Sequence, residues 1–280
     1  MYKDRSHPKM PSSEDTPVSK LALFCSLVLV AFPGIIAIAL QPLGILLGAS
    51  AGADAELPVP ESQLRISIVV NSTILVSVTV LIGVYLTHTV QLRAPVIEAL
   101  LRGRSVAAVF KHQVPPAVVV GSLAAGALVV YGWYQERAVP EFVHQWRAAG
   151  DLSMLARVLY GGVVEEILCR WGLMSLFVWL GWRLVQHGSG KPRAGVLWTG
   201  IVAAALLFWV GHLPLAYAHG LNTPLWICVI IGVNAVLGAG FGWLVWQRGL
   251  ESAMLAHALA HVLAVMLSTF HSFVAGYAEV

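Results

Sequence analysis

Five ionisable side chains stand inside long apolar stretches of this sequence and could do chemistry there: Glu165, Glu166, His212, His257 and His261. A charged group within a membrane costs free energy unless it is paired or hydrated, so it marks a functional site by default. In surroundings of low dielectric constant, a carboxylate beside an imidazole can hold a water molecule and accept its proton. These residue types therefore indicate a hydrolytic site in which an activated water attacks an amide.

Helical spacing separates the two glutamates by role. Glu166 and Arg170 are four residues apart with the acid first, so they share one helix face and can form an ion pair. Glu165 is rotated by about 100° from Glu166 around the helix and stays free to face a cavity. His257 and His261 are also four residues apart and project together. The expected site combines one free carboxylate with three imidazoles from three helices.

Two glycines, Gly161 and Gly162, precede the glutamates by one helical turn. Small residues at such a position allow two helix backbones to approach each other closely in a membrane. We therefore expect a neighbouring helix to pack against this turn.

The same side chains also have less specific interpretations. A single histidine within a span is often a structural hydrogen-bonding residue, and a Glu–Arg pair four residues apart is often a structural tie. Two adjacent glutamates are harder to explain structurally, because one arginine cannot neutralise both. A proton relay or a transport site is the functional alternative for such a pair.

Composition places these residues in a membrane protein. The chain has 280 residues, of which 58% are hydrophobic and only 11% charged, and its mean hydropathy is +0.78. A soluble domain carries about a quarter charged residues. The three cysteines, Cys25, Cys169 and Cys228, lie in apolar runs without CxxC spacing, so we interpret them as buried apolar residues. The net charge of +3 does not indicate a nucleic-acid partner.

Seven apolar runs predict an all-α polytopic membrane protein, because a run of about 20 apolar residues crosses a bilayer as a helix. We place these runs at residues 21–47, 66–90, 114–134, 152–182, 195–217, 224–246 and 250–272. An eighth helix results if Pro33-Gly34 and Pro42 divide the first run. That first run is also too long for a cleaved signal peptide, so we expect it to be retained.

The distribution of Lys and Arg predicts the orientation of the chain in the membrane. Most of the 17 basic residues fall in the N-terminal tail and in alternate loops, which places the N-terminus in the cytoplasm of a cell (inner) membrane. We expect a disordered tail (1–20), N-terminal transmembrane helices (21–150), a catalytic helix core (151–272) and a C-terminal tail (273–280). Within the second part, residues 93–112 predict an interfacial helix.

Three motifs resemble those of the CPBP family of intramembrane proteases, which includes the CAAX prenyl (Rce1-like) proteases and bacteriocin-immunity proteins of the Abi group. Residues 165–170 (EEILCR) fit its EExxxR motif, and residues 208–212 (FWVGH) fit its FxxxH motif. Residues 257–261 (HALAH) stand at its third motif, HxxxN or HxxxD, after a similar glycine-rich segment at 238–249. The resemblance covers about residues 150–270, and the motifs follow one another in the family's order.

The resemblance implies a role for each matching residue. Glu165 and His212 would activate the water, while His257 and the residue at position 261 would stabilise the oxyanion. His261 departs from the usual amide or carboxylate at its position, and it is bulkier.

The remaining motif residues would complete the catalytic set. Glu166 is counted with the catalytic residues, and Arg170 and Phe208 would support the site. The resemblance favours a glutamate protease without a cofactor. The alternative is a zinc site formed by Glu165, His212, His257 and His261, although the HExxH motif is absent because Ala258 stands where it requires Glu.

These observations predict an intramembrane endopeptidase acting on a membrane-associated or lipidated protein, with the lipid bilayer as its surroundings. One alternative is a non-catalytic immunity factor or regulator on the same fold. Another is a proton-coupled transporter that uses Glu165 and Arg157, which the absence of repeated halves in the sequence disfavours.

Overall fold

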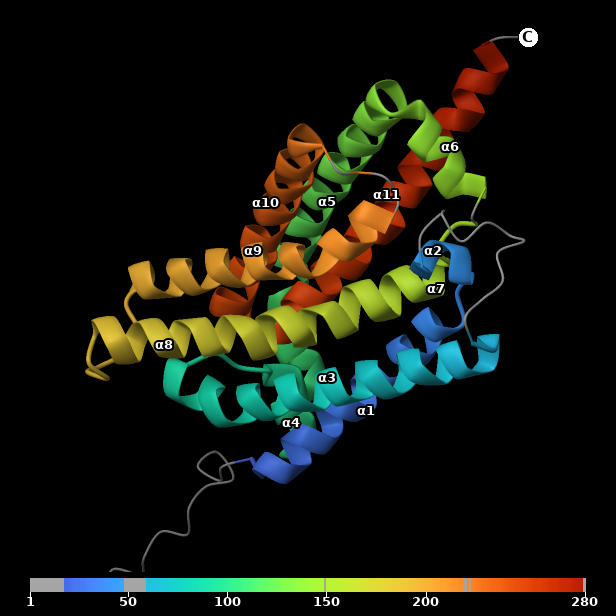
Figure 1. Cartoon of the computed structure of the whole chain (residues 1–280). Helices are drawn as coiled ribbons and strands as arrows, with labels where there is room; N and C mark the ends of the chain where they lie inside the picture. The colour runs from blue at the N-terminus through green and yellow to red at the C-terminus, as the bar shows by residue number, and fades with distance from the viewer. Residues whose placement is uncertain (1–17, 48–58, 149, 219–220, 222, 279–280) are drawn as a thin grey trace, which may run out of the picture.

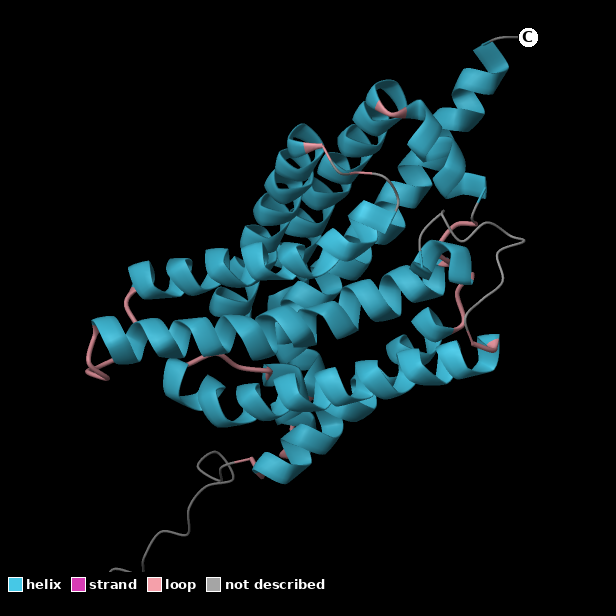
Figure 2. Ribbon diagram, in the orientation of Figure 1, coloured by secondary structure: helices cyan, strands magenta, loops and turns pink. Residues whose placement is uncertain are grey.

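The protein is an all-α polytopic membrane protein. The computed structural model describes residues 18–47, 59–148, 150–218, 221 and 223–278, and every regular element in these ranges is helical (Figure 2). Six helices are long and apolar enough to cross a membrane: α1 (Lys20–Ala39), α3 (Glu61–Val90), α5 (Val106–Ala138), α9 (Ala194–Ala218), α10 (Pro224–Arg248) and, over residues 250–271, α11 (Leu250–Ala278). Large apolar side chains such as Leu29, Leu123 and Phe270 are exposed on them, which lipid tolerates and water does not.

A further long helix crosses the middle of the molecule and corresponds to the predicted span 152–182. It consists of four consecutive segments: α7 (Met154–Ala156), η1 (Arg157–Glu165), η2 (Ile167–Met174) and α8 (Ser175–Val185). We call this continuous helix the central helix. Figure 1 shows it with α3 on one side and α9 on the other, and both helices pack against it. The total of seven spans stays a prediction, because six helices meet the criteria for a span.

The first predicted run divides near Pro42, which is one of the two outcomes that the sequence allows. The run 21–47 is not one helix: α1 ends at Ala39, and the separate short helix α2 (Leu43–Leu47) follows Pro42. Pro has no backbone N–H and fixes φ, so it begins a helix more readily than it continues one. The predicted eighth helix is thus only this short piece.

The prediction of one interfacial helix over 93–112 was wrong. Within this segment only the short helix α4 (Pro95–Leu101) is separate from the long helices. Residues from Val106 onward already belong to α5. The predicted C-terminal tail continues α11 as far as Ala278. The predicted disordered tail lies outside the described residues up to position 17.

Glu251 anchors the start of α11, the helix that carries His257 and His261. Its Oε1 accepts hydrogen bonds from the backbone N–H groups of Val96 (3.0 Å) and Ile97 (2.9 Å) in the first turn of α4. Its Oε2 accepts from Nε2 of Gln113 on α5 at 3.4 Å. A buried carboxylate that fills these orphan helix donors is stabilising, so it fixes α11 against α4 and α5.

Gly83 lets α3 approach the central helix at Trp171. The indole of Trp171 is 1% exposed, and its Nε1 donates to the carbonyl of Val80 at 3.3 Å. A Cβ atom at position 83 would overlap the indole ring. Close contact between α3 and the central helix therefore depends on glycine at this position.

We predict that Gly83→Ala lowers the free energy of unfolding by about 1–3 kcal/mol, because the added methyl group overpacks a filled core. The change is measurable as a lower melting temperature of the purified protein in detergent. Gly126→Ala on α5 is the matched control, since a Cβ there meets nothing within 4 Å. Equal melting temperatures for the two variants would contradict the prediction.

Candidate active site

One cavity of about 680 Å³ collects six of the seven residues predicted for the site: Glu165, Arg170, Phe208, His212, His257 and His261. The central helix, α9 and α11 supply them, and α10 closes the cavity with residues that include Asn234, Gly238 and Phe241. Further lining residues come from α1, α2, α3 and α5. Glu166 does not line it.

The central helix is wound as a π-helix on both sides of Glu166, over Arg157–Glu165 and Ile167–Met174. π-Helical turns are rare, and they occur frequently at functional sites because their wider winding redirects side chains. The sequence pattern predicted an ordinary helix here. No proline falls in these two segments to signal the change.

Glu166 forms the buried ionic centre of the site. Its side chain is 0% exposed, and its Oε1 lies 3.1 Å from Nη1 of Arg170 and 2.8 Å from Nδ1 of His257. Arg170 also donates to the carbonyl of Gly238 at 3.4 Å, and its guanidinium lies 5.5 Å from the ring centroid of Phe241. The predicted Glu166–Arg170 pair is confirmed, and it extends to α10 and α11.

The contact with Glu166 determines how His257 faces the cavity. A carboxylate oxygen only accepts hydrogen bonds, so Nδ1 of His257 carries the hydrogen. Its Nε2 is then directed away from Glu166. The His257 ring stacks on Phe241 at 4.7 Å and on His261 at 4.9 Å between centroids. The ring is held on both faces as well as at Nδ1.

Gly161 and Gly162 receive α11 as predicted. A Cβ at position 161 would lie 2.8 Å from Nε2 of His261 and 3.7 Å from Nε2 of His257. A Cβ at position 162 would lie 2.8 Å from the Cβ of Ala258. Both Nε2 atoms therefore converge over the bare face of Gly161, where a side chain would displace them.

His212 presents a free acceptor to the cavity. Its Nδ1 lies 2.9 Å from the carbonyl oxygen of Phe208, one turn earlier on α9. A carbonyl accepts, so Nδ1 donates, and in the neutral imidazole Nε2 keeps its lone pair. The ring of Phe208 also contacts the imidazole edge-on at 4.4 Å. Phe208 thus fixes both the tautomer and the orientation of His212.

The four residues predicted as alternative zinc ligands line one cavity but do not form a coordination group. Among the described residues, no three His, Cys, Asp or Glu side chains gather closely enough to hold a metal ion. This arrangement does not fit zinc.

Sequence reasoning missed several polar residues of the cavity wall. Tyr160 and Asn234 both line the cavity, and Nδ2 of Asn234 donates to the carbonyl of Ile230 at 2.9 Å. The signal was an amide in the middle of an otherwise apolar run, which is costly in a membrane for the same reason as a charge.

Comparison with known families supports the motif assignment. Residues 148–263 match the family model described as Type II CAAX prenyl endopeptidase Rce1-like. This range contains the central helix, α9, α10 and the part of α11 that carries His257 and His261. The match confirms the predicted resemblance over this part of the chain. No similar protein was found among curated proteins or among solved structures.

We predict that Glu166→Gln destabilises the protein by about 3–5 kcal/mol, because it leaves the buried guanidinium of Arg170 without its counter-charge. Thermal unfolding in detergent measures the loss. The control is Glu136→Gln, which breaks the exposed Glu136–Arg147 pair and should change stability by less than about 1 kcal/mol. Similar losses for both variants would show that the buried pair stabilises the protein no more than the exposed pair does.

Proposed function

We propose that this protein is an intramembrane endopeptidase that hydrolyses a peptide bond of a membrane-associated or lipidated protein. The observation that carries the proposal is the cavity shared by the Glu165 carboxylate, the acceptor nitrogen of His212 and the two Nε2 atoms over Gly161. The family match over residues 148–263 supports a peptidase. In this proposal the site lies in a cell (inner) membrane, with the N-terminus in the cytoplasm.

Glu165 and His212 activate the water in the proposed mechanism. Both offer acceptor atoms to the cavity, so a water molecule between them would donate a hydrogen bond to each. As the water oxygen attacks the carbonyl carbon of the substrate, its proton passes to Glu165. Glu165 then returns that proton to the leaving amine, and the C–N bond of the tetrahedral intermediate breaks.

His261 and His257 stabilise the oxyanion in this mechanism. His261 can donate a hydrogen bond from Nε2 as a neutral imidazole, so it replaces the amide donor usual at its position. His257 already holds a hydrogen on Nδ1 against Glu166. It can donate from Nε2 only as an imidazolium, whose charge the Glu166 carboxylate would balance. We therefore assign His261 as the first donor and His257 as the second.

We predict that Glu165→Gln and His212→Ala each lower kcat by about 100-fold or more, because each removes a group that holds or deprotonates the water. A quenched fluorescent peptide, lipidated and ending in a C-a-a-X sequence, reports turnover by purified protein in detergent. His88→Ala, at an exposed position of α3, should keep full activity.

Comparing the termini of membrane proteins from wild-type and Glu165→Gln cells then identifies natural substrates. Full turnover by Glu165→Gln would remove that residue from the mechanism. A Glu165→Gln variant that fully replaces the wild type in cells would favour a non-catalytic regulator instead.

We predict that turnover is unchanged after treatment with a chelator, because the cavity residues do not form a metal-binding group. Activity is measured on the same peptide, with the metal content of the sample determined by elemental analysis. Loss of activity that added zinc restores would establish a metal mechanism.

A further inference from the structure

Three exposed basic residues stand close together in the sequence where α8 is followed by α9. Arg183 belongs to the last turn of α8, and Lys191 and Arg193 come just before Ala194, the first residue of α9. Figure 1 shows the connection between these two helices at the left edge of the molecule. We call residues 183–193 the basic loop.

The basic loop has no counter-charge in its own part of the chain. The sequence contains neither Asp nor Glu over residues 167–250. Within the ranges that the structure describes, no ion pair forms at Arg183, Lys191 or Arg193. The positive charge of the loop is therefore available to a ligand from outside the protein.

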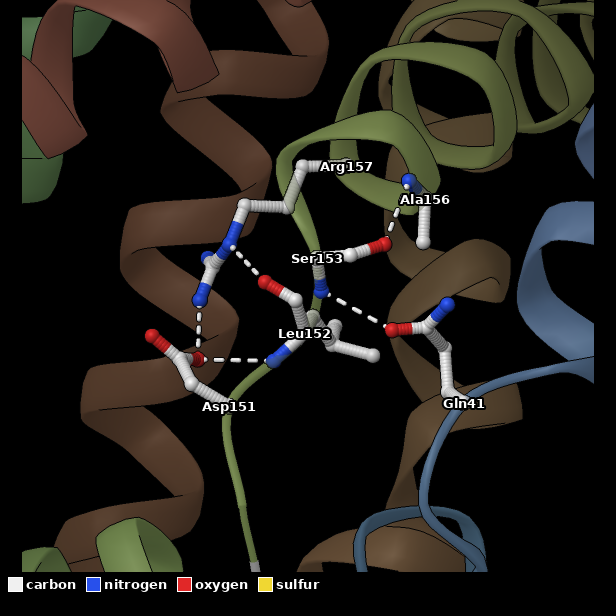
Figure 3. A network of polar contacts seen from close by, with 6 residues as sticks. All are labelled: Gln41, Asp151, Leu152, Ser153, Ala156 and Arg157. Atoms are coloured by element: carbon white, nitrogen blue, oxygen red, sulfur yellow. Dashed lines mark hydrogen bonds and ion pairs between the residues drawn. The ribbon is translucent and has the colours of Figure 1, made fainter.

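The other two arginines of the central helix already have partners. Arg170 pairs with the buried Glu166. At the opposite end of the helix from the basic loop, Arg157 contacts Asp151 and donates from Nε to the carbonyl of Leu152 at 3.0 Å (Figure 3). Arg183 differs from both, because no carboxylate of the described chain neutralises it.

Gln186 holds the basic loop in one conformation. Its Oε1 accepts a hydrogen bond from the backbone N–H of Arg193 at 2.7 Å. Its Nε2 donates to the carbonyls of Ser189 at 3.4 Å and Lys191 at 3.1 Å. One side chain thus ties the beginning of the loop to its end, so the basic residues near α9 project from an ordered backbone.

The loop also folds back onto the end of α8. At Gly188 φ is 73°, a left-handed conformation that favours glycine, and a Cβ there would lie 2.9 Å from Nη1 of Arg183. Nε1 of Trp182 donates to the carbonyl of Gly190 at 2.9 Å. The three basic side chains therefore start from one compact turn.

Apolar side chains border the basic loop. Leu184 and Val185, in the last turn of α8, are 69% and 73% exposed. Trp198, in the second turn of α9, is also exposed and contacts Trp246 edge-on, with ring centroids 6.2 Å apart. Tryptophan is enriched where membrane helices leave the hydrocarbon, so this surface lies at the boundary between acyl chains and headgroups.

An anionic phospholipid matches both halves of this surface. Its phosphate complements the cations, and its acyl chains complement the exposed apolar end of α8. Arginine binds phosphate oxygens through two hydrogen bonds at once, and lysine adds a point charge. The distribution of Lys and Arg predicts that the loop faces the cytoplasm, where anionic lipids give the leaflet a negative surface potential.

We propose that the basic loop binds an anionic phospholipid, with the phosphate held by its three basic side chains and an acyl chain against Leu184 and Val185. Gln186 is a positioning residue, because it orders the backbone from which the basic side chains project. None of these described residues lines the cavity that contains Glu165. The proposal is therefore independent of the proposed peptidase function.

The first test titrates the purified full-length protein, in a neutral detergent, with phosphatidylglycerol or with phosphatidylcholine. A lipid that binds the folded protein raises its melting temperature by mass action, and the titration gives Kd. We expect Kd for phosphatidylglycerol to be about tenfold or more below that for phosphatidylcholine, and to rise with salt. Equal Kd values overturn the proposal. The same stabilisation by inorganic phosphate also overturns it, because a free anion would then suffice.

Charge-removing variants locate the lipid on the loop. Lys191→Gln combined with Arg193→Gln should raise Kd for phosphatidylglycerol about tenfold or more, because each basic residue near the surface adds attraction. The matched control combines Arg93→Gln with Lys111→Gln, which removes two exposed cations outside the loop. It should leave Kd within about twofold, since salt screens distant charges. Equal losses in both double variants would show a general attraction and overturn the site.

A variant that keeps every charge tests the order of the loop. Gln186→Ala removes the hydrogen bonds to Ser189, Lys191 and Arg193, and it should raise Kd for phosphatidylglycerol severalfold. Its melting temperature without lipid should stay close to that of the wild type, because the loop lies outside the packed core. An unchanged Kd would show that charge alone attracts the lipid, which contradicts a built site.

Discussion

The buried carboxylate of Glu166 is the constraint on which the site depends. With no exposure to solvent or lipid, it requires counter-charge and hydrogen bonds from the protein itself. Arg170 supplies the charge from the same helix, and His257 supplies a hydrogen bond from α11. This one carboxylate fixes the rotation of the central helix relative to α11. Because Glu166 faces this pairing, its neighbour Glu165 faces the cavity.

The close approach of α11 to the central helix makes that contact possible. Gly161 and Gly162 leave room for His261 and Ala258, which brings the two Nε2 atoms over the central helix. Hydrogen bonds at the helix ends hold this arrangement. Glu251 fastens the start of α11 to α4, and Gln41 fastens the start of the central helix to the end of α1. The imidazoles are therefore positioned by packing at the middle of each helix and by polar ties at its end.

Local spacing predicted much of this arrangement, and it failed where boundaries depend on neighbours. The Glu166–Arg170 pair and the role of the two glycines followed from positions on one helix face. The segment 93–112 was wrongly predicted as one interfacial helix, because arginines mixed with apolar residues are equally compatible with a helix that extends beyond the bilayer. In the structure α5 already begins at Val106, and Glu251 of a distant helix holds α4. The sequence near 93–112 does not predict that contact, because Glu251 lies far along the chain.

The sequence by itself determined the fold class, the presence of costly ionisable groups inside apolar helices and the pairing of Glu166 with Arg170. These features depend on composition and on the geometry of a single helix, which are local. Only the tertiary structure decided that His257 is the second partner of Glu166, that Glu166 lies outside the cavity and that His212 offers Nε2 as its acceptor. It also decided the π-helical winding around Glu166. His257 and Glu166 are 91 residues apart in the chain, so their contact and the hydrogen position it fixes depend on how separate helices pack.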